Sequence, residues 1–301
     1  MNTLPQQLAN GLLLGSMYGL IAIGYTMVYG IVQLINFAHG EIFMTGAFGA
    51  LTVYAYILPD GTSMVVAVPL MLIGGGIVSV LVAVGAERFA YRPLRQAPRL
   101  APLITAIGLS LSLQELVRNF YPGADKARSF PSLDGNHDIG SVTISDADIF
   151  LVIAAIVCMS GLAWFVRKSR TGRAMQATAQ DPDTAQLMGI DTNRIIVVAF
   201  ILGATLAAVA GVCQGMKVGN ISFDMGFTAG LKAFTAAVLG GIGNIRGAVL
   251  GGLIIGVIEV MITEYIPSGS SWKDVGAFIV LILVLLVRPQ GILGERVADR
   301  A

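Results

Sequence analysis

Apolar segments of about twenty residues recur along the chain and alternate with short polar connections. A helix of about twenty apolar residues is long enough to span a bilayer. Because the second segment is short and the seventh shorter, the pattern predicts about eight transmembrane helices, with one or both short segments broken or re-entrant. The segments cover residues 8–29, 42–58, 64–86, 102–120, 148–166, 195–215, 229–239, 247–266 and 275–287.

Composition supports the same fold class. Apolar residues make up 55% of the 301 residues and charged residues 12%, whereas an average soluble domain has roughly 25% charged residues. The period-two alternation of a membrane barrel is absent. We therefore expect an all-α polytopic membrane protein in which residues 1–301 form a single transmembrane domain. Cys158 and Cys213 lie inside apolar segments, so we expect buried thiols and no disulfide framework.

The basic residues predict the orientation, because cytoplasmic loops of membrane proteins are enriched in Lys and Arg. Residues 167–194 form a basic cytoplasmic loop under this rule, and residues 121–147, with more acidic than basic side chains, form an external loop. The C-terminus is expected in the cytoplasm, whereas the side of the N-terminus depends on whether the second segment crosses. Three groups hold the basic residues, namely Arg88, Arg92, Arg95 and Arg99; Arg167, Lys168, Arg170, Arg173 and Arg194; and Arg288, Arg296 and Arg300.

The basic loop contains two helix signals. Asp181 is a favourable N-cap for a helix that begins at Pro182 and runs to Met188, and Gly189 supplies the left-handed residue that ends it. Another short helix is expected from an N-cap at Thr171 to Gln180. Two short capped helices are suited to docking a partner, but an ordinary solvated connection has the same pattern.

Glycine spacing indicates close helix packing. Glycines recur at every fourth residue in the first segment and again in the eighth, a spacing that lets membrane helices approach closely. Either the glycines pack within the subunit, or they form faces that slide or expose carbonyl groups to a solute. Polar, glycine-bearing interruptions at residues 35–47 and 239–248 are also typical of an internal repeat.

Candidate chemistry is sparse. His39 and Glu41 lie close to the membrane, but the chain has only two histidines, so no metal set can be assembled. We expect Asn36 and His39 to satisfy loose backbone ends and Glu41 to open a helix, where a carboxylate complements the dipole. Glu259 is a buried acid without an assigned role. No phosphate-cradling loop or nucleophilic set occurs, so we expect neither an enzyme nor a cofactor.

The chain resembles the permease subunit of high-affinity branched-chain amino-acid ABC importers over nearly its full length. The matching stretches are residues 15–30, residues 35–41 (INFAHGE), residues 90–95 (AYRPLR), residues 187–191 (LMGID), residues 230–243 and residues 288–293 (RPQGIL). The resemblance implies a multi-pass protein of the bacterial inner membrane that forms half of a translocation path. Its implied partners are membrane lipid, a related or identical second permease subunit, two cytoplasmic ATPases and an external solute-binding protein, with no nucleic acid.

The resemblance also suggests two sets of functional residues. The basic loop matches the place where such permeases carry their coupling helix, which transmits movement of the ATPases. The expected ATPase-coupling residues are Ala177, Gln180, Asp181, Asp183, Ala185, Leu187, Met188 and Gly189. The residues expected to line or shape the translocation path are Asn36, His39, Glu41, Thr45 and Lys232.

Two alternatives remain open at this level. An ABC permease for urea or short amides is one, because Asn244, Arg246 and Val218 depart from the family pattern and put the solute in doubt. An ion-coupled secondary amino-acid transporter is the other. It would need an acid at mid-membrane, for which Glu41 and Glu259 are the candidates.

Overall fold

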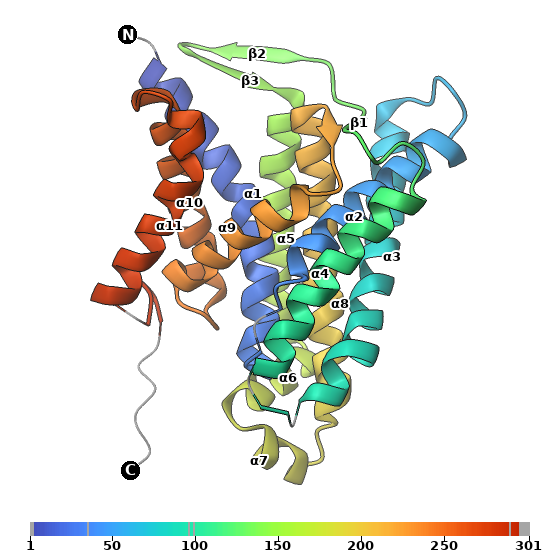
Figure 1. The fold of residues 1–301 in the computed structure, drawn as a ribbon, viewed down its shortest axis with the longest axis vertical. Helices are drawn as coiled ribbons and strands as arrows, with labels where there is room; N and C mark the ends of the chain where they lie inside the picture. The colour runs from blue at the N-terminus through green and yellow to red at the C-terminus, as the bar shows by residue number, and fades with distance from the viewer. Residues whose placement is uncertain (1–2, 35, 96, 99, 289, 295–301) are drawn as a thin grey trace.

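The computed structural model describes residues 3–34, 36–95, 97–98, 100–288 and 290–294, and Figure 1 gives its fold. The predicted basic residues Arg99, Arg296 and Arg300 and the first residue of the predicted interruption, Ile35, lie outside these ranges. Within them the protein is an all-α polytopic membrane protein. It contains seven helices that are long and apolar enough to cross a membrane, and two shorter helices at the positions where the sequence predicts short segments.

The helices follow the predicted segments closely. In chain order they are α1 (Thr3–Val32), α2 (His39–Thr52), α3 (Met64–Gly85), α4 (Leu100–Phe120), α5 (Asp146–Lys168), α6 (Arg170–Gln180), α7 (Pro182–Leu187), α8 (Thr192–Val218), α9 (Met225–Gly240), α10 (Ile245–Tyr265) and α11 (Gly269–Val287). A π-helical turn, Val53–Ile57, extends α2, while α3 continues through Ala86–Tyr91 and Arg92–Leu94. The two short helices are α2 and α9.

Two small antiparallel pairs of strands accompany the helices. Strands β2 (Asn136–Ile139) and β3 (Val142–Ser145) form a hairpin, and β1 (Arg128–Ser129) pairs with β4 (Asn220–Ile221). The hairpin lies at the end of the molecule opposite α6 and α7, and α1 begins at the hairpin end (Figure 1). Helix α11 runs toward the α6–α7 end (Figure 1). The first helix therefore begins on the hairpin side, and the last helix ends toward the opposite side.

Helices α1–α3 and α8–α10 pack in equivalent ways. Helix α1 packs on α10 as α8 packs on α3, α2 packs on α3 as α9 packs on α10, and α2 packs on α8 as α9 packs on α1. Corresponding helices run in opposite directions (Figure 1). This arrangement is that of an inverted repeat, in which two halves are related by an axis in the membrane plane.

The repeat has a different alignment from the one that the sequence suggests. The connections 33–38 and 219–224 are each six residues long and precede the short helices α2 and α9. Each opens with a left-handed residue, Gln33 at φ 55° and Gly219 at φ 75°. Residues 239–248, which the sequence suggested as the repeat of residues 35–47, instead contain the turn between α9 and α10. The equivalent of that turn in the first half is the connection between α2 and α3. The sequence comparison aligned polar residues, whereas the folded chain aligns the backbone breaks.

Glycines bring α1 and α10 into contact. A Cβ atom added at Gly15 would lie 2.6 Å from the Cα atom of Leu253, and one added at Gly252 would lie 2.6 Å from the Cα atom of Gly19. Such distances leave no room for a side chain, so the two backbones pack directly. The interpretation of these glycines as packing residues within the subunit is therefore confirmed.

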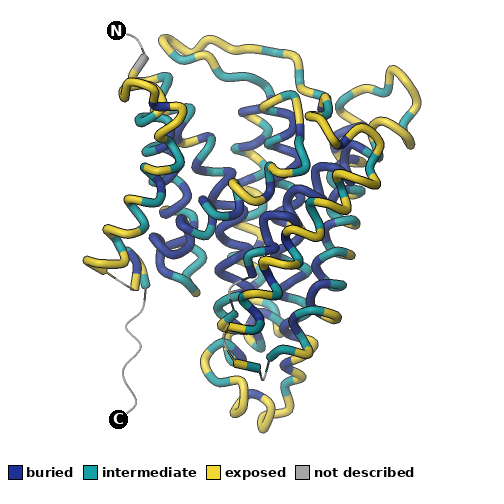
Figure 2. Tube along the Cα trace, viewed as in Figure 1, coloured by how far each residue is buried: buried dark blue, intermediate teal, exposed yellow. Residues whose placement is uncertain are grey.

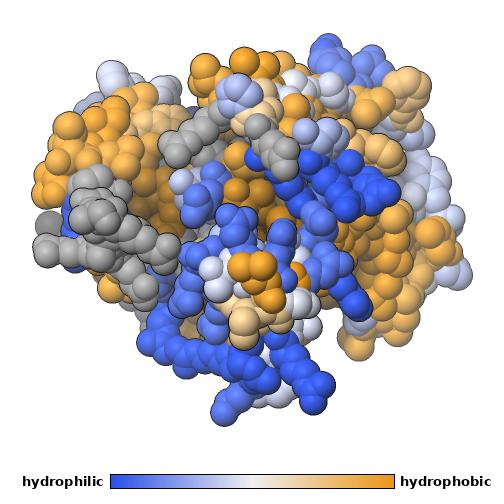
Figure 3. Space-filling view, turned by 90° about the horizontal axis from the view of Figure 1, so that it is seen from below, coloured by the Kyte–Doolittle hydropathy of each residue, from blue (hydrophilic) through white to orange (hydrophobic). Residues whose placement is uncertain are grey.

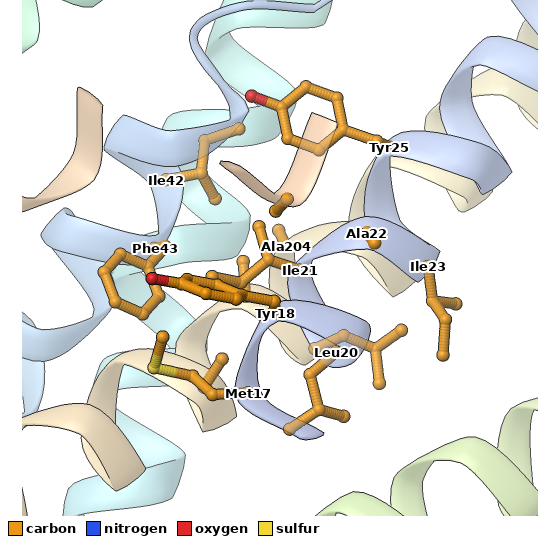
Figure 4. Close-up of a cluster of buried hydrophobic side chains, with 14 of the residues drawn as sticks. Met17, Tyr18, Leu20, Ile21, Ala22, Ile23, Tyr25, Ile42, Phe43 and Ala204 are labelled. Carbon is orange, nitrogen blue, oxygen red and sulfur yellow. The ribbon is translucent and has the colours of Figure 1, made fainter. Parts of the chain in front are cut away.

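The core is concentrated around α1, α2 and α8, while α4, α5 and α11 expose most of their surface (Figure 2). Figure 4 shows the centre of this core, where side chains of α1 such as Met17, Tyr18 and Ile21 lie among Ile42 and Phe43 of α2 and Ala204 of α8. The exposed apolar side chains of the outer helices match a hydrocarbon environment. The free thiol of Cys213 is buried, as predicted, whereas that of Cys158 is only half-buried.

Candidate functional site

Helices α6 and α7 form a compact protruding unit at one end of the molecule. Helix α6 follows α5 after the single residue Ser169, whose hydroxyl accepts a hydrogen bond from the backbone N–H of Gly172 at 2.8 Å. The predicted N-cap at Thr171 is therefore wrong, because Thr171 already lies inside the helix. Gly172 packs against the carbonyl oxygens of Phe165 and Val166, which makes the turn between the helices very tight.

Helix α7 has the caps that the sequence predicts. The Asp181 carboxylate accepts hydrogen bonds from the N–H groups of Asp183 and Thr184, each at 3.1 Å, and Pro182 occupies the first position. Gly189 is left-handed at φ 84° and ends the helix. The N–H of Ile190 donates to the carbonyl of Ala185 at 3.0 Å, so both ends of this short helix are satisfied internally.

The apolar residues of α7 face in two directions. Ala185 is buried, with 3% of its surface exposed, whereas Leu187 is 87% exposed and Met188 is 79% exposed. Figure 3 views the molecule from this end and shows a small hydrophobic patch ringed by hydrophilic residues near its centre. Of the other predicted coupling residues, Gln180, Asp183 and Gly189 are exposed, and Ala177 and Asp181 are half-buried. An exposed apolar tip on a capped helix is suited to protein contact.

A second group of basic residues lies at the same end. Arg95 pairs with the buried carboxylate of Glu87 and donates a hydrogen bond of 2.5 Å to the side-chain oxygen of Asn193, at the start of α8. Burial lowers the pKa of the Arg95 guanidinium, and the charge of Glu87 opposes this effect. The segment after α3 and the α6–α7 unit are thus on one side, as their parity in the sequence predicts.

Of the predicted path residues, Asn36 lies in the break before α2, and His39, Glu41 and Thr45 lie in the first half of α2. Asn36, His39, Glu41 and Thr45 are all buried, with at most 5% of their surface exposed. The Tyr91 hydroxyl donates to the Asn36 side-chain oxygen at 2.5 Å, and the His39 ring stacks edge-on against Tyr25. The Asn36 oxygen thus accepts from a tyrosine hydroxyl rather than from a loose backbone N–H. Thr45 donates to the carbonyl of its own helix at Ile42, at 3.0 Å.

Glu41 connects α2 to the exposed helix α4. One of its carboxylate oxygens accepts hydrogen bonds from the Ser110 hydroxyl at 2.9 Å and from the Gln114 amide at 2.8 Å. Among the described residues, its second oxygen has no hydrogen-bond partner, and the same holds for the Nε2 atom of His39 and the amide nitrogen of Asn36. Buried polar atoms without partners are costly, and these three lie together in the break before α2 and in its first turn.

Lys232 lies apart from these four residues. Its ammonium group is 2.6 Å from a carboxylate oxygen of Glu259 on α10 and 2.6 Å from one of Asp274 on α11, and the Tyr18 hydroxyl donates to Glu259 at 2.8 Å. The sequence analysis identified Glu259 as a buried acid but gave it no role, and it did not identify Tyr18 or Asp274. A signal was present, because an acid inside a span requires a basic partner, and Lys232 is a lysine inside an apolar segment.

Cavities lie at both ends of the described part of the protein. One, of about 430 Å³, is lined by residues of α1, α9 and α10 together with Gln214 and Lys273, and it includes Lys232 and Glu259. The other, of about 830 Å³, lies beside α6 and is lined by residues near the end of α1, by Gln33 just after it, by Gln176 and by Arg246. Neither is lined by Asn36, His39, Glu41 or Thr45. No cluster of metal-binding side chains occurs within the described ranges.

Comparisons with known proteins agree with this architecture. The solved structure of PsaBC from Streptococcus pneumoniae in complex with a Fab covers 93% of this chain and 91% of its own matched chain, with a TM-score of 0.53 and 11% sequence identity. That likeness concerns the fold. Residues 7–285 match the family described as the permease component of the branched-chain amino acid transport system.

Individual relatives give the same result. The chain is 48% identical over 303 aligned residues to the high-affinity branched-chain amino acid transport system permease protein BraD of Pseudomonas aeruginosa, covering 96% of this chain and 95% of that protein. It is 46% identical to the corresponding LivH protein of Escherichia coli K12, with the same coverage. The chain therefore belongs to the family of branched-chain amino acid transport permeases.

Proposed function

We propose that this chain is the transmembrane permease subunit of an ATP-driven importer and forms half of a path for branched-chain amino acids. The observation that carries the proposal is the α6–α7 unit, a rigidly capped pair of helices with an exposed apolar tip on the basic side of a family permease. The amino-acid cargo follows from the names of the relatives BraD and LivH. The proposed location is the bacterial inner membrane, with the α6–α7 unit and the C-terminus in the cytoplasm.

The proposed partners follow from the same reading. Residues 167–194 contact a cytoplasmic ATPase, two of which serve a pair of permease subunits, with the second subunit related or identical to this one. The end with the β2–β3 hairpin, in the loop 121–147, faces the external solute-binding protein that delivers the amino acid. The concentration of Lys and Arg at the α6–α7 end supports this orientation.

A mechanical route connects the proposed docking surface to the spans. Helix α6 packs against α5, α1 and α8, and α7 packs against α6 and α8. When ATP draws the two ATPases together, α7 is displaced, and the displacement reaches α1 and α8 through α6. Since α1 and α8 occupy the centre of the inverted repeat, their tilting alternates access from the two sides. No bond of the cargo is made or broken, so the chain acts as a transporter and not as an enzyme.

The path residues have a role in this proposal. Asn36 in the break before α2 and His39, Glu41 and Thr45 in the first half of α2 shape the path, and Lys232 acts on the hairpin side. Glu259 is already engaged with Lys232 and Tyr18, which leaves this acid poorly placed for the ion-coupled alternative. A urea or short-amide cargo remains the alternative within the ABC class.

Reconstitution tests the proposal. The chain is assembled in proteoliposomes with its second permease subunit, the ATPases and the solute-binding protein, and uptake of labelled leucine is measured. Uptake that requires ATP inside and persists after collapse of ion gradients supports the proposal. Uptake that follows a sodium or proton gradient without ATP would contradict it, and transport of urea but not leucine would assign the alternative cargo.

A further inference from the structure

The cavity at the hairpin end has the dimensions of a small-molecule site. Its volume of about 430 Å³ lies within the range of about 300–1,000 Å³ typical of ligand pockets. It lies inside a single subunit, between α1, α9 and α10, with α8 and α11 contributing one residue each. The site therefore exists without a second copy of the chain.

The cavity contains a buried lysine and a buried glutamate. Lys232 is 3% exposed and Glu259 is 5% exposed, and both line the cavity. Lys232 faces two carboxylates at 2.6 Å, those of Glu259 and Asp274. The cavity lining holds two lysines, Lys232 and Lys273, and two acids, Glu259 and Glu264. Asp274, which is 44% exposed, lies beside Lys232 outside the lining. Three carboxylates therefore face two ammonium groups, and a cationic group in the cavity would balance the excess negative charge.

The rest of the lining is divided into polar and apolar parts. Lys273 is half-buried and supplies a positive charge, while Asn10 and Gln214 supply amide groups. The apolar part comes from Leu14 and Met17 of α1 and from Met225, Ala229 and Val260. A ligand that matches this lining carries an ammonium, a carboxylate and a short apolar side chain.

We propose that this cavity is a binding site for a free amino acid with an apolar side chain, on the external side of each permease subunit. The ammonium lies toward the carboxylates that face Lys232, the carboxylate toward Lys273, and the side chain against Leu14 and Met17. This inference rests on the proposed function for the kind of cargo and adds a site to it. The site receives the amino acid after release from the binding protein and before the spans rearrange.

Cysteine labelling tests the site directly. Cys158 and Cys213 are replaced by alanine, and the complete transporter is prepared with Thr228→Cys, a position exposed in the cavity lining. The matched control is Ser141→Cys, an exposed position between β2 and β3 at the same end. Without ATP or binding protein, membrane-impermeant thiosulfonates of opposite charge, one with a trimethylammonium group and one with a sulfonate, are applied from outside.

The expected results are specific to the cavity. Thr228→Cys reacts at least about threefold faster with the cationic reagent than with the anionic one, because the lining attracts cations. Leucine slows this reaction, and the Ser141→Cys control shows no protection by leucine. Glu259→Gln removes the excess charge and abolishes both the preference and the protection. Asp274→Asn makes the same charge change at a half-exposed position. It replaces Glu259→Gln in this test if the Glu259→Gln variant does not fold.

The opposite results would overturn the proposal. If leucine leaves the rate at Thr228→Cys unchanged, or if both reagents react equally, the cavity is a water-filled crevice without an amino-acid site. Uptake of leucine by the complete transporter is measured in parallel. Uptake tests the proposed function, whereas charge preference and protection by leucine at Thr228→Cys test the cavity proposal.

Discussion

Gly40 of α2 and Gly226 of α9 lie backbone to backbone where the two short helices cross. A Cβ atom added at Gly226 would lie 2.6 Å from the carbonyl oxygen of Gly40, and a Cβ atom added at Gly40 would overlap the carbonyl of Gly226. In the inverted repeat these two residues are equivalent, because each is the second residue of its short helix. The crossing therefore depends on the absence of both side chains.

The first prediction concerns this crossing. Gly226→Ala forces the two backbones apart and destabilises the protein by about 1–3 kcal/mol, the usual cost of overpacking a close-packed core. Thermal unfolding of the detergent-solubilised chain measures the change. The control is Gly161→Ala on α5, where an added Cβ meets nothing within 4 Å. If Gly226→Ala unfolds at the same temperature as this control, the close contact does not constrain the fold.

The second prediction concerns the apolar tip of α7. Leu187→Asp places a charge on a surface that is 87% exposed, so folding is unaffected, but an apolar contact with an ATPase would have to bury that charge. We expect loss of ATPase co-purification and at least about a tenfold drop in ATP-driven uptake, which corresponds to roughly 1.4 kcal/mol.

The control for α7 lies at the opposite end. Ile139→Asp changes a comparably exposed apolar residue in strand β2 and is expected to leave ATPase association intact. If Leu187→Asp co-purifies the ATPases normally and imports leucine at the normal rate, the coupling role assigned to α7 is wrong.

The third prediction concerns the end of α7. Gly189 is left-handed at φ 84°, and its N–H donates to the carbonyl of Gln186 at 2.9 Å. Proline cannot adopt that φ and has no N–H to donate, so Gly189→Pro distorts the end of the helix. We expect a chain that inserts into the membrane at normal levels but assembles poorly with the ATPases. Pro182, in the first position of the helix, shows that proline itself is tolerated where the backbone permits it.

The fourth prediction separates a path role from a packing role at Asn36. Tyr91→Phe removes the hydrogen bond from the Tyr91 hydroxyl to the Asn36 side chain and leaves the amide in place, whereas Asn36→Ala removes both. If Asn36 lines the path, Asn36→Ala lowers the uptake rate more than Tyr91→Phe does, with ATPase assembly intact in both variants. Equal uptake in the two variants would assign Asn36 to packing alone.

Much of the fold could be predicted from local sequence. The apolar segments placed the spanning helices to within a few residues, although α11 begins at Gly269, six residues before its predicted start at 275. The caps of α7 were also predictable, because Asp181, Pro182 and Gly189 act through their own backbone and their immediate neighbours. The start of α6 was mistaken because Ser169 and Thr171 are both acceptable caps. The tight packing of Gly172 against α5, a tertiary contact, favours the first.

By itself, the sequence determined the class of the protein, the positions of its helices, its basic end and the likeness to amino-acid permeases, since each of these depends on residues close together in the chain. Only the tertiary structure decided that the halves repeat through the breaks at 33–38 and 219–224. It also decided that Lys232, Glu259, Asp274 and Tyr18 share one site. Those four side chains come from four helices, α9, α10, α11 and α1, and no local pattern specifies which helices pack together. Packing at glycine contacts such as Gly15 with α10 sets those neighbours, and the neighbours in turn determine which charges meet.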